Sequence, residues 1–139
     1  MKNLYLLLLI LLLTGCSCHS WMRIVEMGNN FALIEADDTS IHYDYSGGGN
    51  CFLGKYAVGV IPVQVLAYNY NDRWIIAKSG SEHRPKESVY WIVDKDYKFT
   101  RLGYHEELKA QTIGPLDSIQ FYDKLKELEI NLKLKDSRE

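Results

Sequence analysis

The amino-acid sequence predicts an α+β domain in which an antiparallel β-meander of five to six strands packs against a C-terminal amphipathic helix. Short runs rich in Val, Ile and aromatic residues alternate with turn residues through the first two thirds of the chain. The 139 residues include 10 Tyr and 3 Trp, which favour strands. The last third instead places apolar residues at helical spacing.

Six segments are predicted as strands, because each is rich in β-branched, aromatic or other apolar residues and lies between turn residues. Pro62 separates the third strand from the fourth, since proline cannot donate to a sheet ladder. A polar loop is predicted over residues 80–88, and the Gly114-Pro115 pair breaks the chain after the last strand. The predicted strands span residues 31–36, 40–45, 58–61, 63–70, 74–79 and 89–94.

Two helices are predicted near the C-terminus. The first is short, over residues 104–111, and the second runs from 118 to about 132. Asp117 is the expected N-cap of the second helix, with Gln120 at the capping-box position. The apolar side chains of this helix form one stripe, expected to pack on one sheet face: Phe121, Leu125, Leu128 and Leu132.

The first fifteen residues have the pattern of a signal peptide. One basic residue, Lys2, precedes a leucine-rich run over 4–13 that is too short to span a bilayer as a helix, which takes about 20 residues. The sequence Leu13-Thr14-Gly15-Cys16 then resembles the lipobox of bacterial lipoproteins. That resemblance implies that the Cys16 thiol is diacylglycerylated, that the chain is cleaved before Cys16 and that the new amino terminus is often acylated too. Lipid chains such as palmitate then hold the mature chain to a membrane.

The signal-peptide and lipobox patterns, together with the predicted strands and helices, divide the chain into four parts. A signal peptide over 1–15 is followed by a lipidated tether over 16–23, a single domain over 24–132 and a frayed polar tail over 133–139. The expected location is extracytoplasmic. Because Ser17 stands where an aspartate would retain some lipoproteins in the inner membrane, we expect the outer membrane if the host has one, and otherwise the outer face of the plasma membrane.

Composition and motifs argue against nucleic acid, nucleotide and metal ligands. The net charge of −2 with mixed signs offers no basic stripe for nucleic acid. Residues 49–55 match the start of a phosphate-binding loop, but Tyr56 stands where a magnesium-binding Ser or Thr is required. The segment Asp94-Lys95-Asp96 is interpreted as a turn, since it lacks the glycine and glutamate of a calcium loop. No cofactor is predicted.

Two cysteines remain beside the lipidated one. Cys18 and Cys51 have no zinc-like spacing, and an extracytoplasmic compartment permits disulfides. Two alternatives stay open: a Cys18–Cys51 bridge that pins the tether to the domain, or a buried Cys51 with Cys18 free or acylated.

Aromatic residues on adjacent predicted strands suggest a recognition surface. If several share the face opposite the helix, they form a platform for a peptide, a glycan or another protein. The alternative is ordinary cross-strand packing. The candidate residues are Tyr43, Tyr45, Tyr68, Tyr70, Trp74, Tyr90 and Trp91.

Catalytic signals are weak. His42 and Asp44 share one face of a predicted strand at i, i+2, where they would form a base or a metal-binding pair, or a solvated sheet surface. The Gly-x-Ser-x-Gly pattern of a nucleophile elbow does not occur in the sequence.

Several runs of the chain resemble a family of small bacterial lipoproteins that is catalogued only as a domain of unknown function. The likeness covers residues 24–130 and carries no activity. The runs are Ile61-Pro62-Val63, Val65, Tyr68, Asn71-Asp72, Trp74-Ile75-Ile76-Ala77-Lys78, Tyr90-Trp91-Ile92-Val93-Asp94-Lys95, and Gly114-Pro115-Leu116 leading to Phe121.

The expected function is that of a non-enzymatic binding or structural module that acts on another envelope component. Small size, weak catalytic signals and abundant aromatic residues favour it. Two alternatives are a small envelope hydrolase or metal-dependent enzyme using His42, and an immunity-type inhibitor of a secreted toxin.

Overall fold

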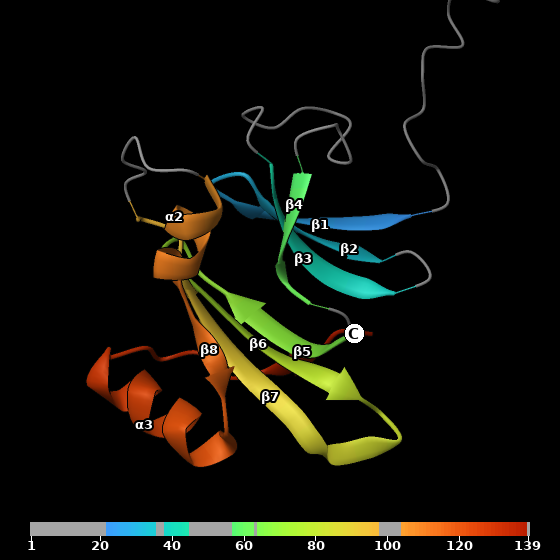
Figure 1. Cartoon of the computed structure of the whole chain (residues 1–139), viewed down its shortest axis with the longest axis vertical. Helices are drawn as coiled ribbons and strands as arrows, with labels where there is room; N and C mark the ends of the chain where they lie inside the picture. Colours follow the sequence, from blue (N-terminus) through green and yellow to red (C-terminus); the bar gives the residue numbers. More distant parts are fainter. Residues whose placement is uncertain (1–21, 36–37, 45–56, 63, 98–103, 139) are drawn as a thin grey trace, which may run out of the picture.

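The computed structural model describes residues 22–35, 38–44, 57–62, 64–97 and 104–138 (Figure 1). Their strands form two antiparallel sheets, and two helices lie after the long β-hairpin of the second sheet. The predicted α+β class with a C-terminal helix is confirmed. The predicted meander is divided between two sheets, which face each other across a shared core.

The first sheet has the strand order β1-β2-β3-β4. The β1–β2 connection is a tight turn in which Asn29 and Asn30 adopt φ values of 49° and 66°. Asparagine tolerates this left-handed conformation better than most residues, which suits it to a hairpin turn. The strands are β1 (Arg23–Gly28), β2 (Phe31–Glu35), β3 (Thr39–Asp44) and β4 (Ala57–Ile61).

The second sheet has the order β8-β7-β6-β5-β9. Its central hairpin is longer than predicted: Ser81 pairs with Arg84, so the prediction of a loop over 80–88 was wrong. The pairing continues because the ladder between two long strands outweighs the polar character of their tips. The strands are β5 (Val65–Tyr70), β6 (Trp74–Ser81), β7 (Arg84–Asp94), β8 (Thr112–Leu116) and β9 (Lys135–Asp136).

The two helices are α2 (Tyr104–Gln111) and α3 (Ser118–Glu127). The predicted capping box is present: the Gln120 amide donates to Asp117 Oδ1 at 2.9 Å, and the Asp117 amide donates to Gln120 Oε1 at 3.1 Å. The second helix ends at Glu127 and not near residue 132, because Glu129 turns the chain with a φ of 54°.

The C-terminal segment and the Gly114-Pro115 pair both differ from expectation. Gly114-Pro115 lies inside β8. The prediction of a frayed tail was wrong for residues 133–138, since Ser137 N donates to Leu66 O at 3.1 Å and Asn69 Nδ2 donates to Lys133 O at 2.7 Å. Backbone pairing with β5 therefore orders polar residues that have no strand signal of their own.

Sheet β8-β7-β6-β5-β9 has an apolar layer on each face. Ile75 and Ala77 of β6 join the core between the two sheets, whereas Trp74 and Ile76 point to the layer beneath α3. Because neighbouring residues of the strand face opposite layers, the first four residues of β6, 74–77, are all apolar and buried, as expected for a strand segment covered on both faces. Figure 1 shows α3 on the outer side of this sheet, away from the first sheet.

Candidate functional site

The aromatic residues proposed as a recognition surface lie on different faces of the fold. Tyr43 is 8% exposed and packs edge-on against Phe31, with ring centroids 4.9 Å apart. Trp74 is 9% exposed and lies beneath α3. These two side chains are therefore part of the hydrophobic core, which agrees with ordinary packing and not with a recognition surface. Tyr45 lies outside the described residues.

The remaining aromatic candidates are divided by the second sheet. Tyr68 and Trp91 pack toward the first sheet, whereas Tyr90 packs against Phe121 of α3 with ring centroids 4.8 Å apart. Tyr70 follows Tyr68 at i, i+2 and is exposed at the rim of the inter-sheet face. Tyr70 is 36% exposed, which is the largest exposed fraction among the described residues of the candidate set.

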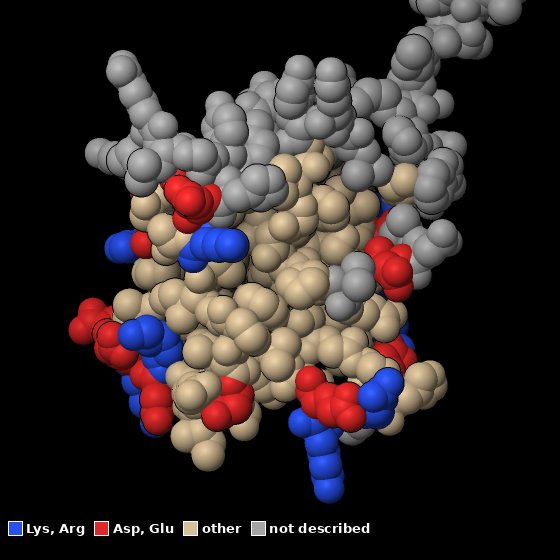
Figure 2. Space-filling model, in the orientation of Figure 1, with Lys and Arg blue, Asp and Glu red and all other residues tan. Residues whose placement is uncertain are grey.

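A groove of about 560 Å³ opens where the two sheets approach α2. We call it the edge groove, because β4 and β8 are the outermost described strands of their sheets on this side. Figure 2 shows mostly uncharged residues over the centre of this face, with charged side chains at its margins. The lining residues are Val58, Gly59, Val60, Trp91, Leu108, Lys109, Thr112, Gly114 and Pro115.

The mostly apolar lining of the groove also contains a buried polar atom that has no hydrogen-bond partner among the described residues. The Trp91 ring is held by its Nε1–H, which donates to Ser79 Oγ at 2.8 Å. Thr112 Oγ1 is buried and has no hydrogen-bond partner among the described residues. The side-chain amide of the adjacent Gln111, 1% exposed, is likewise unpartnered. Buried polar atoms are nearly always satisfied in folded proteins. Thr112 lines the groove, so a water or a ligand bound there would satisfy its Oγ1.

A second, polar pocket of about 590 Å³ lies on another side of the molecule, where the β1–β2 turn meets the ends of β5 and β7. We call it the Lys95 pocket, after the buried ammonium group in its wall. The side chain of Lys95 donates from Nζ to Met27 O, and Asn29 Nδ2 donates to Lys95 O at 3.0 Å. The lining residues are Glu26, Met27, Gly28, Asn29, Tyr70, Asn71, Asp72 and Lys95.

Burial lowers the pKa of Lys95, while the carboxylates of Asp72 and Asp96 act in the opposite sense. Sequence reasoning predicted a turn at 94–96 and missed this site. Residues from three separate segments build it, and the one local signal was a lysine in a turn between two aspartates.

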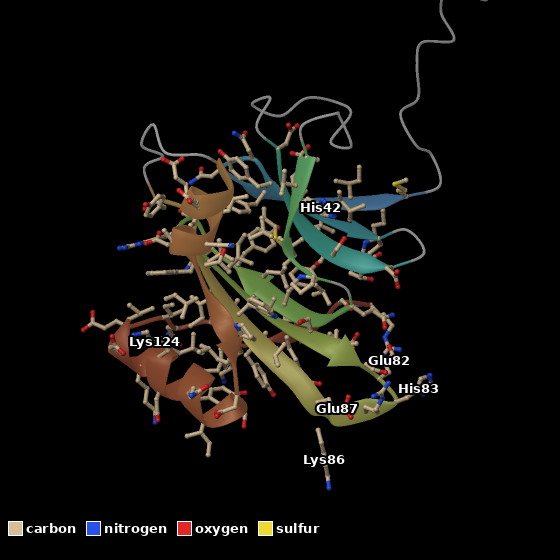
Figure 3. The ribbon with its side chains drawn as sticks, in the orientation of Figure 1. His42, Glu82, His83, Lys86, Glu87 and Lys124 are labelled. Carbon is tan, nitrogen blue, oxygen red and sulfur yellow. The ribbon has the colours of Figure 1, made fainter. Side chains whose placement is uncertain are left out.

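His42 is half-buried on β3, where Nε2 lies 2.8 Å from Ser40 Oγ and Nδ1 has no partner among the described residues. Burial lowers the pKa of His42. Asp44, the other member of the predicted pair, is 1% exposed, so the pair is not a solvated sheet surface. Figure 3 places His42 well away from Glu82, His83 and the other labelled residues of the β6–β7 hairpin.

No metal-binding cluster of His, Cys, Asp or Glu occurs within the part of the chain that the structure describes. In the same residues, no helix is both long and apolar enough to cross a membrane. Cys16, Cys18 and Cys51 lie outside the described residues, so the lipidation and the two cysteine alternatives stay predictions.

Comparison with known proteins gives a family and nothing more specific. No curated protein and no solved structure matches the chain. A family model does match, over residues 28–138, and this range agrees with the resemblance seen in the strand and turn motifs. The chain therefore belongs to the family described as "Protein of unknown function (DUF3997)".

Proposed function

We propose that this chain is a lipid-anchored protein of the cell envelope that binds an extended segment of another envelope protein in the edge groove, and that it acts without catalysis. The observation that carries the proposal is the position of the groove between the outermost described strands of two sheets. The signal-peptide and lipobox patterns at residues 1–16 supply the envelope location.

Strand edges favour a peptide as the occupant. An outermost strand uses only half of its backbone N–H and C=O groups in its own sheet, and the other half can pair with an added strand. The groove has such an edge in each of two walls, β4 and β8. Gly59 of β4 has no side chain, and a Cβ there would meet nothing closer than His42 Cε1 at 3.9 Å, so a partner's backbone has room to approach.

The residues that line the groove indicate which side chains the partner segment carries. Val58 and Val60 are two residues apart on β4, and Leu108 of α2 adds to the apolar surface. Lys109 adds a positive charge. The fitting segment is thus extended, apolar at alternate positions, and acidic where it passes Lys109.

The first described strand begins away from the groove. Figure 1 shows the described chain entering β1 on the side of the molecule opposite α2, whose residues form one wall of the groove. A lipid tether that leads into β1 therefore does not have to pass over the groove.

The test is a pull-down from native envelope with the anchored chain as bait. Val60→Glu places a charge in the groove, Lys109→Glu reverses the charge on the α2 wall, and Ile119→Glu on α3 is the matched control at a side chain that is 74% exposed. We expect one partner to co-purify with the native chain and the control, and to be lost with either groove variant. Circular dichroism checks that each variant is folded.

Cys16→Ala separates anchoring from binding. We expect the untethered chain to capture less of the same partner from intact envelopes, because lipidation concentrates bait and partner on one surface. Equal capture by Val60→Glu, Lys109→Glu and the native chain would contradict the groove as the binding site. Absence of any partner for the anchored chain would contradict the binding function itself.

A further inference from the structure

The Lys95 pocket contains a buried ammonium group whose N–H donors outnumber its acceptors among the described residues. An ammonium group carries three N–H donors. Among the described residues, Lys95 Nζ has one hydrogen-bond acceptor, Met27 O. A Cβ added at Gly28 would lie 3.4 Å from Nζ, at van der Waals contact, so the glycine leaves the space beside Nζ free. A buried charge gains from further acceptors, and the open side of the pocket is where a ligand would provide them.

Carboxylates on the pocket rim balance this charge. Glu26 and Asp72 are both exposed, and neither forms an ion pair among the described residues. A small anion in the pocket would meet these carboxylates, and a small cation would meet Lys95. A ligand without net charge avoids both repulsions. Hydroxyl groups suit such a ligand, because they accept from the ammonium group and donate to the carboxylates.

Tyr70 gives the pocket an apolar face. Its ring is 36% exposed and lies beside Tyr68, with ring centroids 6.5 Å apart and ring planes within 9°. Lys95 Nζ lies over the Tyr70 ring, 5.6 Å from its centroid, so the ammonium group and the ring border the same part of the pocket. An aromatic face beside donors and acceptors suits a ligand that is apolar on one side and polar at its edge.

We propose that the Lys95 pocket binds a neutral saccharide. The C–H face of a sugar ring packs on Tyr70, and its hydroxyl groups meet Lys95 Nζ and the Asp72 carboxylate. The pocket volume of about 590 Å³ lies within the range of small-molecule sites. This site is separate from the edge groove, so the proposal stands independently of the peptide-binding function.

Calorimetric titration of the full chain, held in a detergent without a sugar headgroup, tests the proposal. The probes are chitotriose and maltotriose as neutral sugars, with citrate as an anion of small size. We expect a neutral sugar to bind and citrate not to bind. Tyr70→Ala should weaken sugar binding about tenfold, since it removes the stacking surface.

Asp72→Asn and Lys95→Met test the polar contacts, and Tyr122→Ala is the matched control, because Tyr122 is an exposed tyrosine on α3. Weakened sugar binding in Asp72→Asn or Lys95→Met, with the control unchanged, supports the assignment. Should Lys95→Met fail to fold, the two exposed positions Tyr70 and Asp72 still decide the result. The proposal is overturned if neither sugar binds, if citrate binds instead, or if Tyr70→Ala binds the sugar as tightly as the native chain.

Discussion

His42 shows how burial, at the scale of one residue, turns an ordinary ionisable group into a pH-sensitive one. Its imidazole is half-buried and lies within hydrogen-bond distance of Ser40 Oγ, and desolvation holds its pKa below the ordinary value of 6.5. The unfolded chain therefore binds more protons than the folded chain at pH values between the folded-state pKa and 6.5. Stability must fall as the pH is lowered through that window.

We predict that replacing His42 removes this part of the acid sensitivity. The free energy of unfolding of the native chain should drop on acidification from 6.5 to the folded-state pKa of His42, and His42→Gln should drop less over the same range. Urea unfolding at a series of pH values measures the free energy of unfolding of the native chain and of His42→Gln. His83→Gln is the matched control, because that side chain lies exposed on the β6–β7 turn. Parallel curves for the native chain and His42→Gln would refute the assignment.

Gly114 explains, at the scale of one element, why β8 forms against its local sequence. Its φ of 148° favours glycine, and a Cβ there would lie 2.6 Å from Trp91 Cε3 and 2.9 Å from Tyr90 O. The strand thus lies directly against the Trp91 ring. That close approach also shapes the edge groove, since both residues line it.

We predict that Gly114→Ala destabilises the fold by about 2–4 kcal/mol, through backbone strain and the clash with β7. Gly59→Ala is the matched control within the same groove, since its added Cβ would find its nearest atom at 3.9 Å. We expect Gly59→Ala to change stability by less than about 1 kcal/mol. Chemical denaturation monitored by circular dichroism compares the two, and equal stabilities would show that β8 can move away from Trp91.

The elements that the sequence predicted well are those with local signals. The capping box at Asp117 and the turn residues around 71–73 are readable within a few positions. By contrast, Gly114-Pro115 suggests a break, and residues 135–136 are polar, so β8 and β9 depend on pairing with distant strands. The Lys95 pocket and the edge groove could not be predicted for the same reason, because each collects residues that are far apart along the chain.

The molecule as a whole depends on one apolar layer that both sheets share. Phe31, Leu33 and Ile41 of the first sheet contact the same cluster as Ile75 and Val93 of the second. Neither sheet can leave this layer without exposing the other. The two sheets should therefore unfold together, as expected for a small domain in which both sheets share one core cluster.

Ile75→Ala tests this cooperativity, because Ile75 is fully buried on the face of β6 that packs toward the first sheet. We expect a loss of about 2–5 kcal/mol. Hydrogen exchange should show equal loss of protection in β2 and β7, although the substitution lies in neither strand. Ile119→Ala on the exposed face of α3 should leave both unchanged. If β2 kept its protection while β7 lost it, the sheets would be separate folding units, and the edge groove between β4 and β8 would no longer be a rigid site.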